Sequence, residues 1–261
     1  MAFPSLVAVL SPPDRASASI AFETSFGIEP FSVTEEYMSS IDQDGKIAGC
    51  NAPSVKMNIH CSQPHLECAA HVLPSSCGFK VSDAIMNGEV ENSLLITPDI
   101  IKLKDSGETY PVGDLNDYVI SRKSLESALA QSGDLTGVQS LIIRVENQFL
   151  SLRTDKHETL NWPYLTLECA SFIHSQFRHI RTNLPAVERP DSKAGMWSHN
   201  LIFFGSDECT NFAQIRECPQ KTIGELFFIP SAVADGRYSL ICPFVEMGLD
   251  CAITSPLLYR R

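Results

Sequence analysis

The chain has 261 residues, of which 44% are hydrophobic and 20% are charged, and its formal net charge is −11. This composition is that of a globular protein, and the length suits one large domain, which we take to be residues 1–261. Such an acidic chain repels phosphates and no apolar run is long enough to cross a membrane, so we expect neither nucleic acid nor a membrane as partner. The nine cysteines include no CxxC pair and no secretion signal is recognisable, which together predict a cytoplasmic setting.

Stretches rich in aliphatic and β-branched residues predict strands along most of the chain. In chain order they are residues 5–10, 19–26, 55–61, 93–103, 137–147, 199–205, 224–230 and 238–247. Within 55–61, alternation places His60 on the opposite side from Val55 and Ile59. The Val, Ile and Leu content of 137–147 is typical of a buried central strand.

Two stretches predict helices. Residues 121–133 offer Ser121 or Ser124 as an N-cap, followed by apolar residues at helical spacing. Residues 166–177 begin with Thr166, which can cap a helix in the same way. The whole pattern predicts a strand-rich α/β or α+β domain with a few covering helices.

The stretch HCSQPHLECAAH, residues 60–71, concentrates side chains that can bind a metal or transfer protons. If it is extended, residues two apart share a face. The residues that would then lie on one side are Cys61, Gln63, His65 and Glu67. Thiolate, imidazole and carboxylate groups are all acceptable zinc ligands. A second interpretation stays open, in which His65 and His71 are hydrogen-bonded near the surface and the cysteines fill the core.

The same stretch resembles the metal-binding motif H-x-G-T-H-x-D-x-P-x-H of the cyclase family, which includes bacterial kynurenine formamidase and isatin hydrolase. His65 and His71 match the second and third histidines of that motif. Cys61 stands at the position of the first histidine, and Glu67 stands at the position of the aspartate.

Later segments add to the resemblance. Residues 121–147 resemble the family's helix and central strand, residues 184–205 supply His199, and residues 212–226 supply Glu217. The resemblance implies the family's swivelling β/β/α domain. It also implies a homo-oligomer, a dimer or tetramer, in which a neighbouring chain reaches toward the active site.

The resemblance implies a divalent metal centre with zinc or manganese as the cofactor. The implied metal ligands are Cys61, His65, Glu67, His199 and Glu217. His71 would be the general acid/base, and Trp197 is the candidate for contacting a small-molecule substrate. The implied reaction is hydrolysis of a small amide, formamide or lactam by metal-activated water, as in kynurenine formamidase.

Two alternatives remain at this point. One is a metal-free cyclase or dehydratase on the same scaffold, in which His65, Glu67 and His71 transfer protons. The other is a non-catalytic binding homologue that has lost the metal site. The sequence contains no GxSxG elbow, no P-loop and no GxGxxG, so other common catalytic motifs are not competing explanations.

Overall fold

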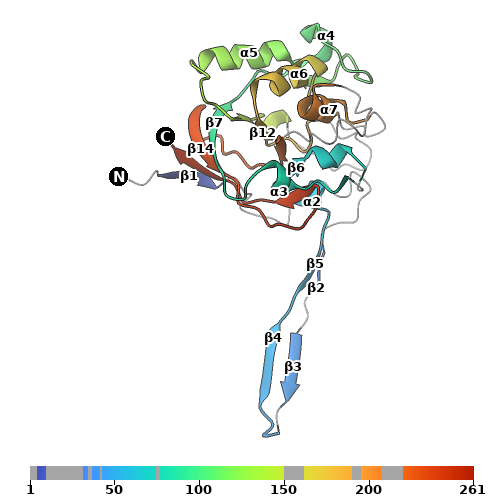
Figure 1. The fold of residues 1–261 in the computed structure, drawn as a ribbon, viewed down its shortest axis with the longest axis vertical. Coiled ribbons are helices and arrows are strands. Elements are labelled where there is room, and N and C mark those ends of the chain that lie inside the picture. Colours follow the sequence, from blue (N-terminus) through green and yellow to red (C-terminus); the bar gives the residue numbers. More distant parts are fainter. Residues whose placement is uncertain are drawn as a thin grey trace.

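The computed structural model describes residues 5–9, 32–34, 37–41, 43–74, 77–149, 162–189, 195–206 and 220–261. These residues include a nine-stranded sheet that forms the body of the molecule (Figure 1). Its strands are β1 (Leu6–Val9), β6 (His65–Cys68), β7 (Val90–Ile96), β10 (Ser140–Ile143), β12 (His179–Thr182), β13 (Thr222–Glu225), β14 (Gly236–Ile241), β15 (Cys251–Ile253) and β16 (Leu257–Arg260).

The strand order is β1-β16-β14-β7-β10-β12-β13-β6-β15. The four central strands, β7, β10, β12 and β13, are parallel to one another. On one side β6 and β15 continue the sheet in antiparallel pairing, and on the other side β14, β16 and β1 do the same. Parallel strands are buried on both faces, which is why β10 and the end of β7 read as continuous apolar runs.

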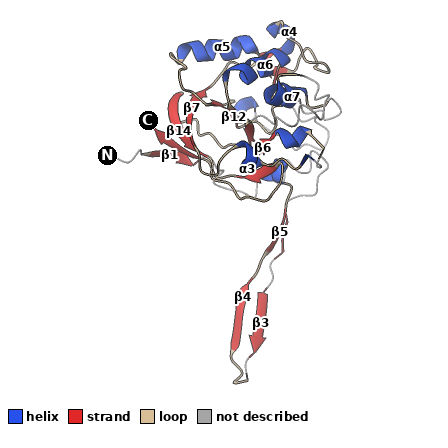
Figure 2. Ribbon diagram, viewed as in Figure 1, coloured by secondary structure: helices blue, strands red, loops and turns tan. Residues whose placement is uncertain are grey.

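Three helices cover one face of this sheet: α5 (Arg122–Gln131), α6 (Leu167–Gln176) and α7 (Trp197–Phe204) (Figure 2). Alternate strand residues such as Leu141 and Ile143 point toward these helices and form one buried core with them. The residues between them, such as Leu95 and Ile142, form a second core with β14, β16 and α3 (Val81–Ala84). The curled sheet therefore has a helix-covered face and an inner face, and each face has its own core.

Smaller elements complete the body. A three-stranded sheet contains β8 (Ile101–Lys102), β9 (Tyr118–Ile120) and β11 (Tyr164–Leu165). The short helical segments are α2 (Ile59–Ser62), the 3-10 helix η1 (Ala69–Val72), α4 (Leu103–Ser106) and the 3-10 helix η3 (Asn147–Phe149). Among the described residues, no helix is both long enough and apolar enough to span a membrane.

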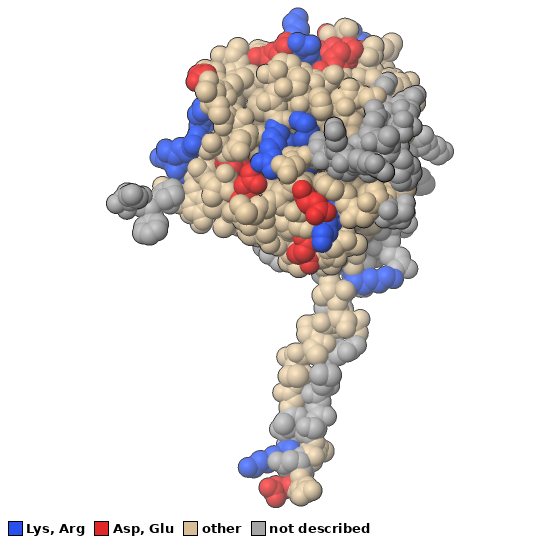
Figure 3. Space-filling view, viewed as in Figure 1, with Lys and Arg blue, Asp and Glu red and all other residues tan. Residues whose placement is uncertain are grey.

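A two-stranded ribbon projects from the body (Figure 1). It is built from two antiparallel pairs, β2 (Ser32–Thr34) with β5 (Ser54–Lys56), and β3 (Tyr37–Ile41) with β4 (Ile47–Asn51). On the face shown in Figure 3, positive and negative side chains are interspersed over the body, without a continuous basic surface.

Both predicted helices are confirmed, together with their caps. The Ser121 hydroxyl accepts a hydrogen bond from the backbone N–H of Ser124 at 3.0 Å and caps α5. The Thr166 hydroxyl accepts one from the backbone N–H of Cys169 at 3.2 Å and caps α6. Strands overlap the predicted stretches 5–10, 93–103, 137–147 and 238–247, and two of them, β7 and β14, begin a few residues earlier than predicted. The predicted strand 19–26 lies outside the described residues.

Three strand predictions are wrong in whole or in part. Residues 199–205 belong to helix α7, because a short apolar run has no periodicity that separates a buried helix from a buried strand. Strand β5 ends at Lys56, and the rest of 55–61 enters the helical turn α2, so the alternation expected there does not hold. Strand β13 ends at Glu225, because Leu226 adopts a positive φ of 58°.

Candidate metal centre

Strand β6 places two potential ligands side by side on the helix-covered face. His65 and Glu67 are two residues apart in an extended strand, so both side chains point the same way, and both are fully buried. The neighbouring strand β13 pairs Glu225 with His65 and adds a second buried carboxylate. Two antiparallel neighbours therefore bring one imidazole and two carboxylates to the same place.

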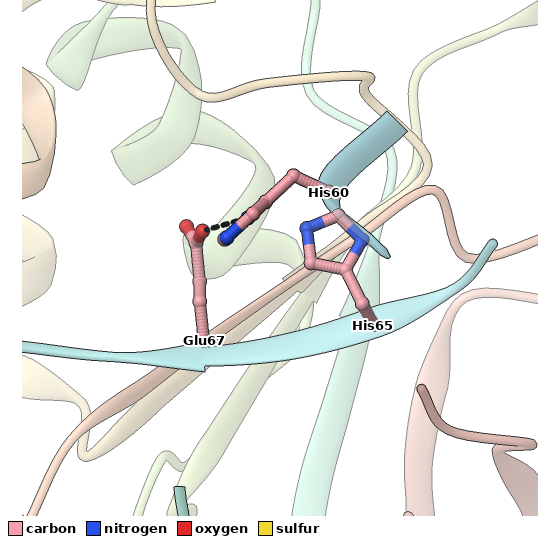
Figure 4. A group of neighbouring side chains, drawn as sticks. All are labelled: His60, His65 and Glu67. Atoms are coloured by element: carbon pink, nitrogen blue, oxygen red, sulfur yellow. Dashed lines mark ion pairs between the residues drawn. The ribbon is translucent and has the colours of Figure 1, made fainter. Parts of the chain in front are cut away.

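Short elements around β6 supply the remaining side chains. Helix α2 precedes β6 and carries His60, whose ring lies between the His65 ring and the Glu67 carboxylate in Figure 4. The 3-10 helix η1 follows β6 directly and carries His71, and helix α7 contributes His199. Asp250 stands just before β15. Segments far apart in the sequence therefore meet around Glu67.

One nitrogen of each of these histidines faces a carboxylate at the centre of the group. His60 Nδ1 lies 3.2 Å from Glu67 Oε2, and His71 Nε2 lies 3.6 Å from the same oxygen. His199 Nε2 lies 2.7 Å from Glu67 Oε1. His65 Nε2 lies 3.8 Å from Glu225 Oε2.

The other nitrogen of each ring is held by an oxygen acceptor outside the centre. His65 Nδ1 donates to the Gln63 carbonyl at 2.9 Å, which leaves Nε2 with a free lone pair. His60 Nε2 and His71 Nδ1 each donate to Asp250 Oδ2, at 3.2 and 3.1 Å. His199 Nδ1 donates in the same way to Glu188 Oε1 at 3.1 Å. Outer acceptors of this kind fix the tautomer of metal-binding histidines and aim the inner nitrogen at the ion.

The inner atoms fit a divalent cation better than they fit one another. Within the described part of the chain, His60 Nδ1, His65 Nε2 and Glu67 Oε2 are buried without a hydrogen-bond partner. Buried polar atoms normally have a partner, so such a group calls for an explanation. Tetrahedral zinc with ligand bonds of about 2.0–2.2 Å holds its ligand atoms roughly 3.3–3.6 Å apart. The contacts of Glu67 Oε2 with His60 and His71, at 3.2 and 3.6 Å, are close to that spacing.

Three overlapping sets of side chains have ligand atoms within 4.8 Å of one another. They are His60, His65 and Glu67; His60, His71 and Asp250; and Glu67, His71 and His199. All donors are imidazole nitrogens or carboxylate oxygens, which suit zinc and manganese. The residues present therefore fit a divalent metal.

The histidine pKa values reflect burial next to carboxylates. Burial lowers the pKa of His65 to about 4, and the neighbouring His60 adds to that effect. Burial also opposes protonation of His199, but the adjacent Glu67 and Glu188 outweigh it and raise the His199 pKa. A neutral His65 is the form that can donate its lone pair to a metal.

The two central carboxylates have opposite pKa shifts. Burial raises the pKa of Glu225 to about 8, and the negative charge of Glu67 raises it further. Burial also favours the neutral form of Glu67, but the nearby His71 and His199 outweigh it and lower the Glu67 pKa. Among the described residues, no lysine or arginine is paired with either carboxylate. Positive charge in the metal-free site therefore comes from histidines whose pKa values the carboxylates raise despite burial, His60 and His199, and a bound cation would replace those protons.

Four of the predicted site residues are brought together by the structure: His65, Glu67, His71 and His199. The side chain of Cys61 and the whole of Glu217 lie outside the described part of the chain. The ring of Trp197 packs edge-on against that of Tyr110, with 5.7 Å between the ring centroids.

Sequence reasoning missed His60, Glu225 and Asp250, as well as Glu188 behind His199. His60 was expected to point away from His65, but the helical turn α2 replaces the alternation of a strand. Glu225 could have been considered because it precedes the apolar stretch 226–229, but only the pairing of β13 with β6 shows what it faces. No local signal marks Asp250.

No family model matches the sequence, and no curated protein matches it either. Solved structures do match, and they define the class of fold: this is a mixed α/β fold with one large curled sheet, shared with a predicted metal-dependent hydrolase and with isatin hydrolase.

Three matching structures illustrate the likeness. Isatin hydrolase A from Labrenzia aggregata, bound to benzyl benzoate, is 11% identical, with a TM-score of 0.56 over 89% of this chain and 84% of its own. A predicted metal-dependent hydrolase from Bacillus stearothermophilus is 13% identical, with a TM-score of 0.50 over 89% of this chain and 100% of its own. A potential metal-dependent hydrolase with cyclase activity is 12% identical, with a TM-score of 0.50 over 88% and 98%. At these identities the likeness concerns the fold alone.

Proposed function

We propose that this protein is a metal-dependent hydrolase of a small amide, formamide or lactam, with zinc or manganese as its cofactor. The observation that carries the proposal is the arrangement of four histidines, each anchored outward by an oxygen acceptor and each aiming its other nitrogen at Glu67 or Glu225. The solved structures with this fold include a predicted metal-dependent hydrolase and isatin hydrolase, and isatin is a cyclic amide.

Glu67 would be the central ligand, because its two oxygens face different partners. Oε2 faces His60 and His71, and Oε1 faces His199. Glu225 lies beside this group, with one oxygen 3.8 Å from His65 Nε2 and the other 3.8 Å from His199 Nε2. A divalent cation held there supplies Lewis acidity, which polarises a carbonyl oxygen and lowers the pKa of water.

His71 is suited to move the proton that amide hydrolysis requires. Its Nδ1 is held by Asp250, its Nε2 faces the centre of the group, and its side chain is 23% exposed. The buried His65 and His199 lack that access. An imidazole can take a proton from water and deliver it to the departing nitrogen, because its ordinary pKa lies near neutral pH.

One observation favours a metal-free catalyst instead. His199 Nε2 and Glu67 Oε1 are 2.7 Å apart, which is a hydrogen bond and is shorter than the usual spacing of two ligands on one ion. In that case His199, Glu67 and His71 would catalyse a cyclisation or dehydration by proton transfer alone. Metal content separates the two functions.

The test uses untagged full-length protein, since a polyhistidine tag would itself bind metal. Metal content is measured by elemental analysis, and hydrolysis of isatin and of N-formylkynurenine is followed before and after dialysis against a chelator and after adding back Zn²⁺ or Mn²⁺. We expect bound divalent metal and an activity that disappears with the chelator and returns with the metal. Hydrolysis that persists in metal-free protein would contradict the metal-dependent function, and absence of bound metal together with absence of hydrolysis would refute it.

We also propose that the protein forms a homo-oligomer through its projecting ribbon. Isolated two-stranded hairpins are marginally stable in water, and this one leaves the apolar Ile41 and Val55 exposed. Thr34 and Ser54 are direct partners in the ribbon, so replacing residues 35–53 by Asn-Gly would close a shorter hairpin. Light scattering should show a dimer or tetramer for the natural chain and a smaller species for the shortened one; a monomeric natural chain would refute this proposal.

A further inference from the structure

We propose that Glu188 is a positioning residue that aims His199 at the metal centre, and that the Tyr110 hydroxyl holds Glu188 in place. This inference rests on the proposed metal centre and adds residues that lie behind it. Glu188 belongs to the irregular segment after β12 and is 5% exposed.

A single oxygen of Glu188 holds both the backbone and the ring of His199. Glu188 Oε1 accepts the backbone N–H of His199 at 2.8 Å and the ring Nδ1–H at 3.1 Å. The position of the His199 backbone and the orientation of its ring therefore both depend on Glu188 Oε1. A proton kept on Nδ1 leaves the lone pair on Nε2, the nitrogen that faces Glu67.

The first of these bonds also caps helix α7. His199 is the third residue of that helix, and the N-cap residue, Met196, makes no side-chain cap. A carboxylate that accepts a free N–H in the first turn, at the positive end of the helix dipole, stabilises the helix start. Glu188 thus fixes the start of α7 and the orientation of the ring it carries.

Tyr110 holds the other oxygen of Glu188. The Tyr110 hydroxyl donates to Glu188 Oε2, and its ring packs against Tyr164 and Trp197 with centroids 4.6 and 5.7 Å apart. A hydroxyl fixed by a buried aromatic cluster restricts rotation of the carboxylate. The aromatic residues are in this way connected to the metal centre through Glu188 and His199.

A purely structural role for Glu188 makes a different prediction. If Glu188 only caps α7, its loss should lower the stability of the metal-free protein and leave the metal-binding geometry unchanged. If it positions His199, metal affinity and ligand geometry should change even in a variant that retains the cap. Glu188→Gln keeps an oxygen that can cap the helix, but it removes the negative charge that polarises the His199 ring and replaces the oxygen that accepts from Tyr110 with an NH₂ donor. A loss of helix capping alone would therefore leave metal affinity unchanged in this variant, whereas a loss of positioning would not.

The experiment measures Co²⁺ affinity by competition with a chelating dye, the visible absorption spectrum of the bound Co²⁺, and thermal unfolding of the metal-free protein. The variants are Glu188→Gln and Tyr110→Phe, with Tyr164→Phe as the matched control. Tyr164 belongs to the same aromatic cluster but donates to Asp117 at 2.9 Å instead of Glu188.

We expect Glu188→Gln to weaken Co²⁺ binding by about tenfold to a hundredfold and to alter the absorption spectrum. Tyr110→Phe should produce the same spectral change with a smaller loss of affinity, and Tyr164→Phe should match the natural protein. A folded Glu188→Gln variant with unchanged affinity and spectrum would overturn the proposal. If that variant does not fold, Tyr110→Phe decides by the same criteria, because it keeps the ring packing on Trp197 and the cap bond from His199 to Glu188. Failure of the natural protein to bind Co²⁺ would instead refute the metal centre itself.

Discussion

The central sheet carries two buried polar clusters, one on each face, and they are built differently. On the inner face, Arg181 pairs with Glu91 at 2.8 Å, and Ser140 donates to the same carboxylate. Arg181 also donates to the backbone carbonyls of Ile180 and Thr222. On the helix-covered face, histidines and carboxylates surround Glu67 with no arginine or lysine paired to it among the described residues.

The comparison shows the difference between a structural ion pair and a binding site. The Arg181 and Glu91 charges cancel, and although Arg181 Nε has no hydrogen-bond partner in the described chain, both terminal nitrogens do. Around Glu67, by contrast, inner nitrogens and a carboxylate oxygen face one another without satisfying one another. The first cluster balances its own charges, and the second contains inner atoms that a bound cation would satisfy.

The largest effect should come from Glu67→Gln. The change removes the central charge while keeping the shape of the side chain, so we expect metal binding at this site to be abolished. The metal-free variant should unfold at a lower temperature than the metal-free natural protein, because the effect of burial is outweighed by His71 and His199, which lower the Glu67 pKa and so stabilise its ionised form in the folded state. Zinc titration by calorimetry and thermal unfolding measure the two effects. A variant that keeps its zinc affinity would show that Glu67 is not the central ligand.

Arg181→Met should lower the free energy of unfolding without changing zinc affinity. Removing one partner of a buried ion pair leaves Glu91 uncompensated, which typically costs about 3–5 kcal/mol of unfolding free energy. Urea denaturation measures that loss, and zinc affinity of the folded fraction should not change. The double variant Arg181→Met with Glu91→Leu should recover much of the stability. A loss of zinc binding in these variants would mean that the two clusters are coupled.

Glu225→Gln should change how stability depends on pH. The folded-state pKa of Glu225 is raised from its ordinary 4.5 to about 8, mainly by burial. Its stabilising contribution is therefore complete below pH 4.5 and is lost as the pH rises through about 8. Metal-free Glu225→Gln should be more stable than the natural protein at pH 9, by up to a few kcal/mol, and equally stable at pH 4. Equal stability at both pH values, measured by urea denaturation, would contradict this.

Gly224→Ala tests whether the Arg181 cluster and the Glu67 cluster are independent, and its expected effect on stability is smaller. Gly224 precedes Glu225 in β13 but faces the other side of the sheet, where an added Cβ would lie 2.7 Å from Arg181 Cδ and 2.8 Å from the Phe227 ring. Overpacking of this kind costs about 1–3 kcal/mol. We expect a lower unfolding temperature with zinc affinity changed by less than about tenfold. A larger loss of zinc affinity would indicate that Arg181 positions Glu225 through the strand.

The parts of the fold that the sequence predicts are those whose signals are local. The N-caps Ser121 and Thr166 mark two helices, because a capping hydroxyl acts within its own turn. Helix α7 has no such side-chain cap and is apolar on most sides, so its sequence resembles that of a strand. The cap it does have comes from Glu188, which no local pattern reveals.

The residues of the candidate site also fall into those with a local sequence signal and those without one. His65 and Glu67 are predictable as a pair because strand alternation joins them. His60 is not, because a single helical turn reverses the side that alternation assigns to it. Glu225 depends on the register of β13 against β6, and Asp250 on how the chain enters β15. Those are non-local features that one sequence does not encode in a readable pattern.

The central claim is that an ion completes the cluster around Glu67, and anomalous diffraction at the zinc edge from crystals grown with Zn²⁺ tests it most directly. The account predicts an anomalous peak about 2.0–2.2 Å from a Glu67 carboxylate oxygen and from the inner nitrogens of at least two of the surrounding histidines. Crystals that contain zinc at other positions but show no peak beside Glu67 would contradict it.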